Sequence, residues 1–123
     1  MTEHLIGVIS DTHGLLRPQA VEALKGVELI IHAGDIGDPK ILLALERIAP
    51  VHAVRGNTDR GDWAAKLPHI RLVEVGGMLI WVLHELFSLD LDPAAAGFNA
   101  VIFGHSHRAH LERTDGDLYL NPG

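Results

Sequence analysis

Four short clusters of histidine, aspartate and asparagine each follow an apolar run of strand length. They are Asp11-Thr12-His13, Gly34-Asp35, Gly56-Asn57-Thr58-Asp59 and Gly104-His105-Ser106-His107, and His84 ends a further apolar run. Carboxylate and amide oxygens suit hard cations, whereas imidazole selects transition metals over magnesium or calcium. The mixed set therefore predicts a pair of divalent ions, with manganese, iron, zinc and nickel as the candidates. Two such ions can hold a hydroxide between them and clamp the oxygens of a phosphoryl group.

The first half of the chain predicts the elements that position these clusters. Apolar runs at 5–9, 27–32 and 51–55 predict buried strands. A helix is expected from Pro18 to about Lys25, and a second from Pro39, with Asp38 as its N-cap, to just before Pro50. This β-α-β-α-β order implies parallel strands with right-handed crossovers. Ligands bind beyond the carboxyl ends of such strands, so the clusters are expected to converge there.

The second half predicts a different pattern. Strands at 70–75 and 78–84 flank Gly76-Gly77 as a hairpin, and a short helix is expected from Asp92-Pro93 through Ala96. A buried strand follows at 100–103, and a last hairpin joins 109–113 to 118–120 across Asp115-Gly116. The fold class is therefore α/β, with two sheets packed together in one domain over residues 1–123.

Composition restricts the function classes. A net charge of −6 argues against a nucleic-acid surface that depends on phosphate contacts. The chain has no cysteine, which excludes a disulfide framework or a thiolate metal site. No apolar run approaches membrane-spanning length, and the N-terminus lacks a signal-peptide pattern, so a cytoplasmic protein is expected.

Several ligand assignments have competing structural explanations. Asn57 could serve only a left-handed turn after Gly56. His105 and His107 alternate along the chain, so a regular strand would point them to opposite sides. Both can be ligands only where the strand bends.

The ordered motifs Asp-x-His, Gly-Asp, Gly-Asn-x-Asp and Gly-His-x-His resemble the calcineurin-like metallophosphoesterases. The strings Ile9-Ser10-Asp11-Thr12-His13-Gly14 and His32-Ala33-Gly34-Asp35, and the ending Asn121-Pro122-Gly123, are similar to the small YfcE/MJ0936-type phosphodiesterases. That subgroup is also similar to the retromer subunit Vps29. The resemblance runs from Val8 to the end of the chain. It implies a four-layer fold in which two mixed β-sheets are sandwiched between helices.

The resemblance also implies a ligand set. Asp11, His13 and His107 would hold one metal ion, and Asn57, His84 and His105 would hold the other. Asp35 would bridge the two ions, which are expected to be Mn²⁺, with Ni²⁺, Zn²⁺ or Fe²⁺ as alternatives. Members of the family hydrolyse phosphomonoesters or phosphodiesters with a metal-bound hydroxide, which implies catalytic roles for Asp11, His13, Asp35, Asn57 and His105.

Four neighbouring residues are candidates for supporting roles. Arg55 and Arg108 adjoin motif residues and could contact phosphate oxygens, although a surface ion pair is the equal alternative. Asp59 is expected either to cap a turn or to orient the ligands through a hydrogen bond. For His32, an orienting role of this kind and a purely structural role are equal alternatives.

The chain departs from the family pattern in three places. Thr58 stands where larger relatives carry a histidine thought to protonate the leaving group, which would favour leaving groups that need no proton. Glu85 follows His84 where the family usually has glycine, so Glu85 could itself reach the second metal. The chain ends at Gly123, where relatives continue into further strands. The C-terminal strands are therefore expected to be shortened, and an exposed sheet edge would favour a homo-oligomer.

Two functions remain open at this point. The leading hypothesis is a dinuclear metal-dependent phosphoesterase acting on a small-molecule phosphate ester, most simply a phosphodiester. The alternative is a catalytically weak, metal-binding interaction scaffold of the Vps29 kind.

Overall fold

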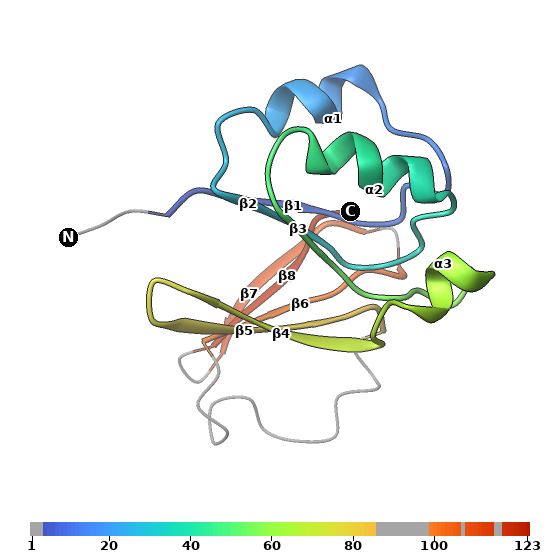
Figure 1. Cartoon of the computed structure of the whole chain (residues 1–123). Helices are drawn as coiled ribbons and strands as arrows, with labels where there is room; N and C mark the ends of the chain where they lie inside the picture. Colours follow the sequence, from blue (N-terminus) through green and yellow to red (C-terminus); the bar gives the residue numbers. More distant parts are fainter. Residues whose placement is uncertain (1–3, 86–98, 107, 115–116) are drawn as a thin grey trace.

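The computed structural model describes residues 4–85, 99–106, 108–114 and 117–123. Its elements form two sheets, with two of the three described helices stacked on the first sheet (Figure 1). The predicted short helix at 92–96 and the turn at Asp115-Gly116 lie outside the described residues. None of the described helices is long and apolar enough to cross a membrane.

The first sheet is parallel in all of its described strands, in the order β1-β2-β3. The strands alternate with two helices along the chain: β1 (Ile6–Ile9), α1 (Pro18–Ala23), β2 (Leu29–His32), α2 (Pro39–Glu46) and β3 (Val51–Ala53). Helix α2 begins as predicted, because Asp38 accepts a hydrogen bond from the Lys40 amide and Pro39 occupies the first turn. The β-α-β-α-β prediction therefore holds, with each strand shorter than expected by one or two residues.

The second sheet is mixed, in the order β4-β5-β6-β8-β7. Its strands are β4 (Ile70–Val75), β5 (Met78–Leu83), β6 (Ala100–Ile102), β7 (His110–Thr114) and β8 (Asp117–Asn121). Strand β6 pairs in parallel with both β5 and β8, whereas the two predicted hairpins, β4–β5 and β7–β8, are antiparallel. The connection from β3 to β4 contains a short helix, α3 (Asp62–Ala65), that the sequence pattern did not predict.

The core is divided between two faces of the first sheet. Alternate residues of a strand point to opposite sides, so Ile30 packs with the helices while Ile31 packs against the second sheet. Both side chains are fully buried. The inter-sheet cluster includes Val82 of β5 and Ile102 of β6. This packing brings the ends of β5 and β6 close to the ends of β1 and β2.

Candidate metal centre

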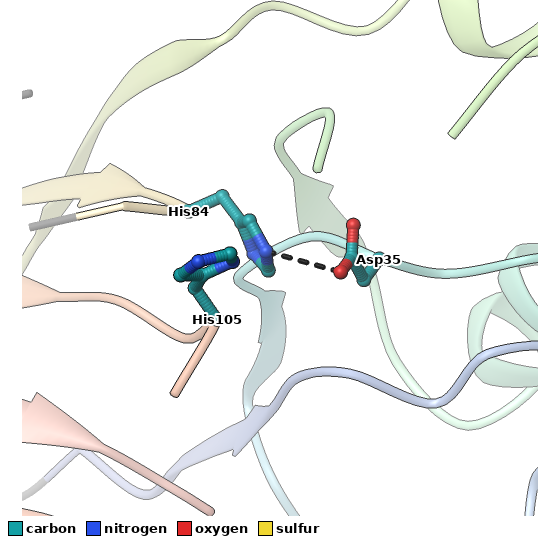
Figure 2. Close-up of side chains that lie close together, drawn as sticks. All are labelled: Asp35, His84 and His105. Atoms are coloured by element: carbon teal, nitrogen blue, oxygen red, sulfur yellow. Dashed lines mark ion pairs between the residues drawn. The ribbon is translucent and has the colours of Figure 1, made fainter. Parts of the chain in front are cut away.

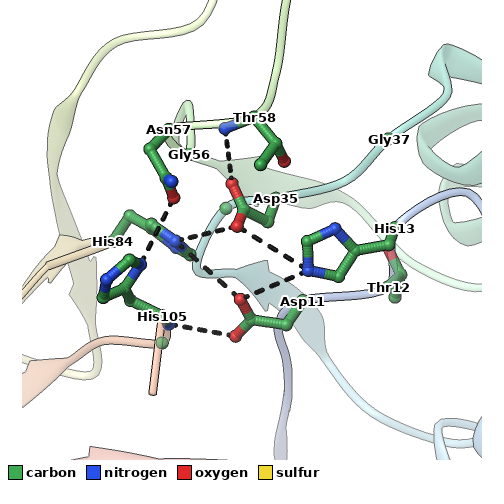
Figure 3. Close-up of polar contacts among 12 residues, drawn as sticks. Asp11, Thr12, His13, Asp35, Gly37, Gly56, Asn57, Thr58, His84 and His105 are labelled. Atoms are coloured by element: carbon green, nitrogen blue, oxygen red, sulfur yellow. Dashed lines mark hydrogen bonds and ion pairs between the residues drawn. The ribbon is translucent and has the colours of Figure 1, made fainter. Parts of the chain in front are cut away.

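The first sheet supplies two carboxylates and a histidine at its strand ends. Asp11 and His13 follow β1, and Asp35 follows β2 by three residues. The side chains of Asp11 and Asp35 are 2% and 3% exposed, whereas His13 is 40% exposed. His13 Nε2 lies 3.9 Å from Asp11 Oδ1 and 3.7 Å from Asp35 Oδ2 (Figure 3). The predicted convergence of these two motifs is therefore present in the structure.

The second sheet supplies two histidines from the opposite side. His84 directly follows β5, and its Nε2 lies 3.2 Å from Asp35 Oδ2 and 3.8 Å from Asp11 Oδ1. His105 follows β6, and its ring stands edge-on to that of His84 at a centroid distance of 5.2 Å (Figure 2). The His105 amide donates to Asp11 Oδ2 at 3.1 Å. The site therefore lies between the two sheets.

Two sets of side chains are close enough to hold a metal ion each, and Asp35 belongs to both. Asp11, His13 and Asp35 form one set, and Asp35, His84 and His105 form the other; in each, one ligand atom per residue lies within 4.8 Å of the others. A carboxylate has two oxygens and can therefore contact two cations. His107, the remaining predicted ligand, lies outside the described residues.

The chemistry of these atoms fits a cation. His84 Nδ1 lies 2.8 Å from the Ala33 carbonyl, which can only accept, so Nδ1 carries a hydrogen and Nε2 is the ring atom that faces the carboxylates and could bind a metal ion. The Asn57 amide oxygen lies 3.0 Å from His84 Nε2, 3.3 Å from His105 Nδ1 and 3.1–3.2 Å from the Asp35 oxygens. A cation would satisfy these converging lone pairs together. In the absence of a cation, the Asn57 side-chain amide rotated by 180° donates hydrogen bonds from its NH₂ group to the same atoms.

The backbone at the site is strained. All four non-glycine residues with positive φ among the described residues belong to the predicted ligand set: Asp11 (54°), His13 (46°), Asp35 (57°) and His105 (74°). Each such conformation costs of order 1 kcal/mol or more and persists only where the surrounding structure enforces it. The left-handed φ of His105 is also the bend that its predicted role requires at the end of β6.

Asp59 connects the Gly34-Asp35 motif to its own motif, Gly56-Asn57-Thr58-Asp59. Its side chain is buried, and it accepts hydrogen bonds from the Gly37 amide at 3.0 Å and the Gly56 amide at 2.9 Å. The Thr58 amide completes the connection by donating to Asp35 Oδ1 at 2.9 Å. Burial alone would raise the pKa of Asp35, but the hydrogen bonds from Thr58 and the nearby His84 and His13 rings hold that pKa below its ordinary value. Asp35 is therefore kept as a carboxylate.

His32 connects the Asp11-Thr12-His13 motif to the Gly34-Asp35 motif. Its Nδ1 accepts from the Gly34 amide at 3.1 Å, so the proton sits on Nε2, which donates to Thr12 Oγ1 at 3.0 Å. Thr12 in turn donates to the Ile36 carbonyl at 2.9 Å. Burial lowers the pKa of His32 to about 4, so the ring is neutral near pH 7. These hydrogen bonds connect the loop that carries Asp11 and His13 to the loop that carries Asp35.

Two groups that hold the site in place, the Asn121 side chain and the Thr58 amide, were not predicted from the sequence. Asn121 is buried, and its amide donates to the Gly104 carbonyl and to Ser106 Oγ, both at 3.1 Å, which fixes the loop that carries His105. The Thr58 amide is a main-chain donor that any residue except proline would provide. The Asn-Pro-Gly ending was the available signal for Asn121, whereas the sequence contains no signal for the Thr58 contact.

A cavity of about 340 Å³ opens beside the second ligand set. Arg55 lines it, and its Nε donates to the Asp59 carbonyl at 3.2 Å. Glu85 lines it from the β5 side and lies outside both ligand sets, with Oε1 3.8 Å from His105 Nδ1. Arg108 is exposed and is absent from the described residues that line this cavity, with its amide donating to Ser106 Oγ at 3.3 Å.

The fold and the site together define a class: α/β proteins with two packed sheets and a candidate two-metal centre between their strand ends. A model of the calcineurin-like phosphoesterase superfamily domain matches residues 5–123. The chain therefore belongs to the calcineurin-like phosphoesterase superfamily, and the family predicted from the motifs is confirmed.

Individual relatives agree with this assignment. A probable metallophosphoesterase of Methanothermobacter thermautotrophicus is 39% identical, over 97% of this chain and 76% of the relative. Phosphodiesterase MJ0936 of Methanocaldococcus jannaschii is 28% identical, over 96% of this chain and 82% of the relative.

Solved structures agree on the fold. The structure of a novel archaeal phosphodiesterase matches with a TM-score of 0.83 at 27% identity, over 96% of this chain and 82% of the other. Vps29 of Chaetomium thermophilum matches with a TM-score of 0.82 at 23% identity, over 98% of this chain and 71% of the other, a likeness of fold alone. The α/β fold with two packed sheets and the likeness to the MJ0936 subgroup are thus both confirmed.

Proposed function

We propose that this protein is a dinuclear metal-dependent phosphoesterase whose preferred substrates are phosphodiesters. The observation that carries the proposal is the position of Asp35, whose carboxylate belongs to both candidate ligand sets. Membership of the superfamily supports a phosphate ester as the substrate.

Each candidate ligand has a role in this proposal. Asp11 and His13, with His107, would hold one ion; Asn57, His84 and His105 would hold the other, and Asp35 would bridge them. Bound divalent ions would lower the pKa of a water molecule and offset the negative charge on the phosphate oxygens. The mixed nitrogen and oxygen ligands favour manganese, with nickel, zinc or iron(II) as alternatives.

The remaining residues position the metal ligands and contribute to the choice of substrate. The Thr58 amide, Asp59 and His32 hold the ligand loops through the hydrogen bonds described above, so the carboxylates are aligned before substrate arrives. Arg55 lines the adjoining cavity and can donate to a phosphate oxygen there. Thr58 in place of a histidine supplies no imidazole to protonate the leaving group, which favours esters of acidic alcohols.

The test is hydrolysis of bis-p-nitrophenyl phosphate by metal-stripped protein, with Mn²⁺, Ni²⁺, Zn²⁺ or Mg²⁺ added back. We expect turnover that depends on the metal. The Asp35→Asn variant keeps an oxygen for the Thr58 amide but loses the bridging charge, so we expect it to stay folded and to lose about a hundredfold or more of the turnover.

Asp62→Asn on the exposed start of α3 is the matched control and should retain activity. Wild-type turnover in Asp35→Asn would refute the bridging role. Absence of turnover in wild-type protein that is folded and metal-loaded would favour the second candidate, an interaction scaffold. The exposure of two leucines on the edge strands of the second sheet favours this candidate. Leu72 is 60% exposed and Leu111 is 70% exposed.

A further inference from the structure

Glu85 adjoins the second ligand set and lines the cavity beside it. It directly follows His84, and its Oε1 lies 3.8 Å from His105 Nδ1. Its side chain is 25% exposed and lines the cavity of about 340 Å³. Glu85 stands outside both ligand sets and lines the cavity beside them, so it is close to whatever part of a substrate would occupy that cavity.

The cavity has an uneven charge distribution. Arg55, held at the end of β3 by the Asp59 carbonyl, contributes a guanidinium, and Glu85 contributes a carboxylate from the end of β5. Ile70 and Leu83 add apolar surface to the same lining. Beside Glu85, an uncharged ester substituent avoids the repulsion that a second anionic oxygen would meet, while Arg55 remains able to donate to a phosphate oxygen.

We propose that Glu85 is a specificity-determining residue that selects phosphodiesters against phosphomonoesters. The inference rests on the proposed function. A phosphomonoester carries close to two negative charges near pH 8, because its second pKa is about 6, whereas a diester carries one. Like charges at close range repel, so the Glu85 carboxylate disfavours the dianion. The second ester substituent of a diester replaces the additional charge and occupies the cavity.

The experiment compares substrates that share one leaving group and differ in charge. Methyl p-nitrophenyl phosphate is a small monoanion and p-nitrophenyl phosphate is a dianion of similar size. Glu85→Gln removes the charge and keeps the shape of the side chain. We expect the ratio of kcat/KM for diester over monoester to fall about tenfold in this variant, chiefly through a lower KM for the monoester.

Two controls separate the local charge from other effects. Glu46→Gln, exposed at the end of α2, makes the same change in net charge away from the cavity and should leave the ratio unaltered. Raising the salt concentration should lower the ratio of the wild-type protein, because salt screens a partly exposed charge. The ratio of Glu85→Gln should respond less to salt.

The outcomes distinguish this inference from the proposed function. An unchanged ratio in Glu85→Gln, with turnover retained, would reject the selectivity role and leave the phosphoesterase proposal standing. Equal loss on both substrates with fewer metal ions per chain would also reject it, because Glu85 would then be a ligand. Wild-type protein that turns over neither ester would reject the proposed function itself.

Discussion

At the scale of single residues, His32 shows how a buried neutral ring can organise two loops at once. Its Nδ1 accepts from Gly34 and its Nε2 donates to Thr12, so both ring nitrogens are used only in the neutral form. A proton on Nδ1 would break the Gly34 contact and place a charge where the ring is 0% exposed. The contacts around the ligand loops therefore depend on pH.

The first residue-scale prediction concerns acid stability of the metal-free protein. The pKa of His32 is about 4 in the folded state and about 6.5 in the unfolded state, so the unfolded chain binds more protons between these values. Folding stability is therefore lost as pH falls through this window. The linkage removes about 2 kcal/mol of unfolding free energy between pH 7.5 and pH 5. Urea unfolding with a chelator present measures it.

The control for this prediction is His32→Gln, which is less stable at every pH but lacks the titrating ring. Its unfolding free energy should fall less between pH 7.5 and pH 5 than that of the wild-type protein. An equal decrease in unfolding free energy in both proteins would show that other groups cause the loss of stability in acid.

Residue chemistry made much of the site predictable. Asp11, His13, Asp35, Asn57, His84 and His105 were candidates from residue type and position, and the family resemblance implied their grouping. The structure brings these six side chains together. His84 Nε2 lies 3.2 Å from Asp35 Oδ2, whereas Glu85 lines the adjoining cavity, so the geometry favours His84 as the ligand. The main-chain contact from Thr58 could not be predicted, because amide donors have no sequence signature.

At the scale of elements, the loops approach one another more closely than a turn requires. Gly56 and Gly104, which precede Asn57 and His105, do not have positive φ. A Cβ at Gly56 would collide with the Asp35 backbone and carboxylate, and one at Gly104 would lie 2.6 Å from Asp11 Oδ2. These two positions require glycine because a ligand from another strand occupies the space.

Asn121 at the end of β8 gives the element-scale prediction. Asn121→Ala removes the hydrogen bonds to the Gly104 carbonyl and Ser106 Oγ. We expect a loss of about 1–3 kcal/mol in stability, the cost of leaving buried polar groups unsatisfied. Because the loop carries His105, we also expect weaker metal binding, measured by calorimetric titration with Mn²⁺.

Asn99→Ala provides the matched control. Asn99 Oδ1 accepts from the Leu79 amide at 2.9 Å, at the opposite end of β5 from His84. Its loss should lower stability and leave the metal affinity unchanged. Equal affinities in the two variants would contradict the role of Asn121 in fixing the His105 loop.

The elements themselves were only partly predictable. Apolar runs and proline positions were sufficient for β1 to β3, α1 and α2, because burial on both faces produces continuous apolar strands. Helix α3 was missed, since a four-residue helix has no apolar periodicity to detect. The order of the second sheet was also beyond prediction, because β8 inserts between β6 and β7 through pairing that depends on the tertiary fold.

At the scale of the whole molecule, the candidate ligands come from both sheets. Asp11, His13, Asp35 and Asn57 follow strands of the first sheet, and His84 and His105 follow strands of the second. A metal ion bound by the second set would therefore connect the two sheets, in addition to the apolar cluster between them. Binding should stabilise the whole fold, because this arrangement is absent from the unfolded chain.

The whole-molecule prediction is a metal-dependent melting temperature. With Mn²⁺ at a hundred times its dissociation constant, linkage adds about 2.7 kcal/mol, which corresponds to roughly 10 °C for a chain of this size. Differential scanning calorimetry with Mn²⁺ and with a chelator measures the shift. Asp35→Asn should lose most of it. An equal shift in wild type and Asp35→Asn would mean that the metal binds elsewhere.

The hydrogen bond from the His105 amide to Asp11 spans 94 positions of the chain. This contact can form only once the long intervening chain has closed, which costs conformational entropy before the contact is gained. The first sheet, built from neighbouring β-α-β units, can form before it, with Asp11, His13 and Asp35 already on its edge. The second ligand set is complete only when the second sheet docks, so metal affinity during refolding follows the arrival of the last half of the chain.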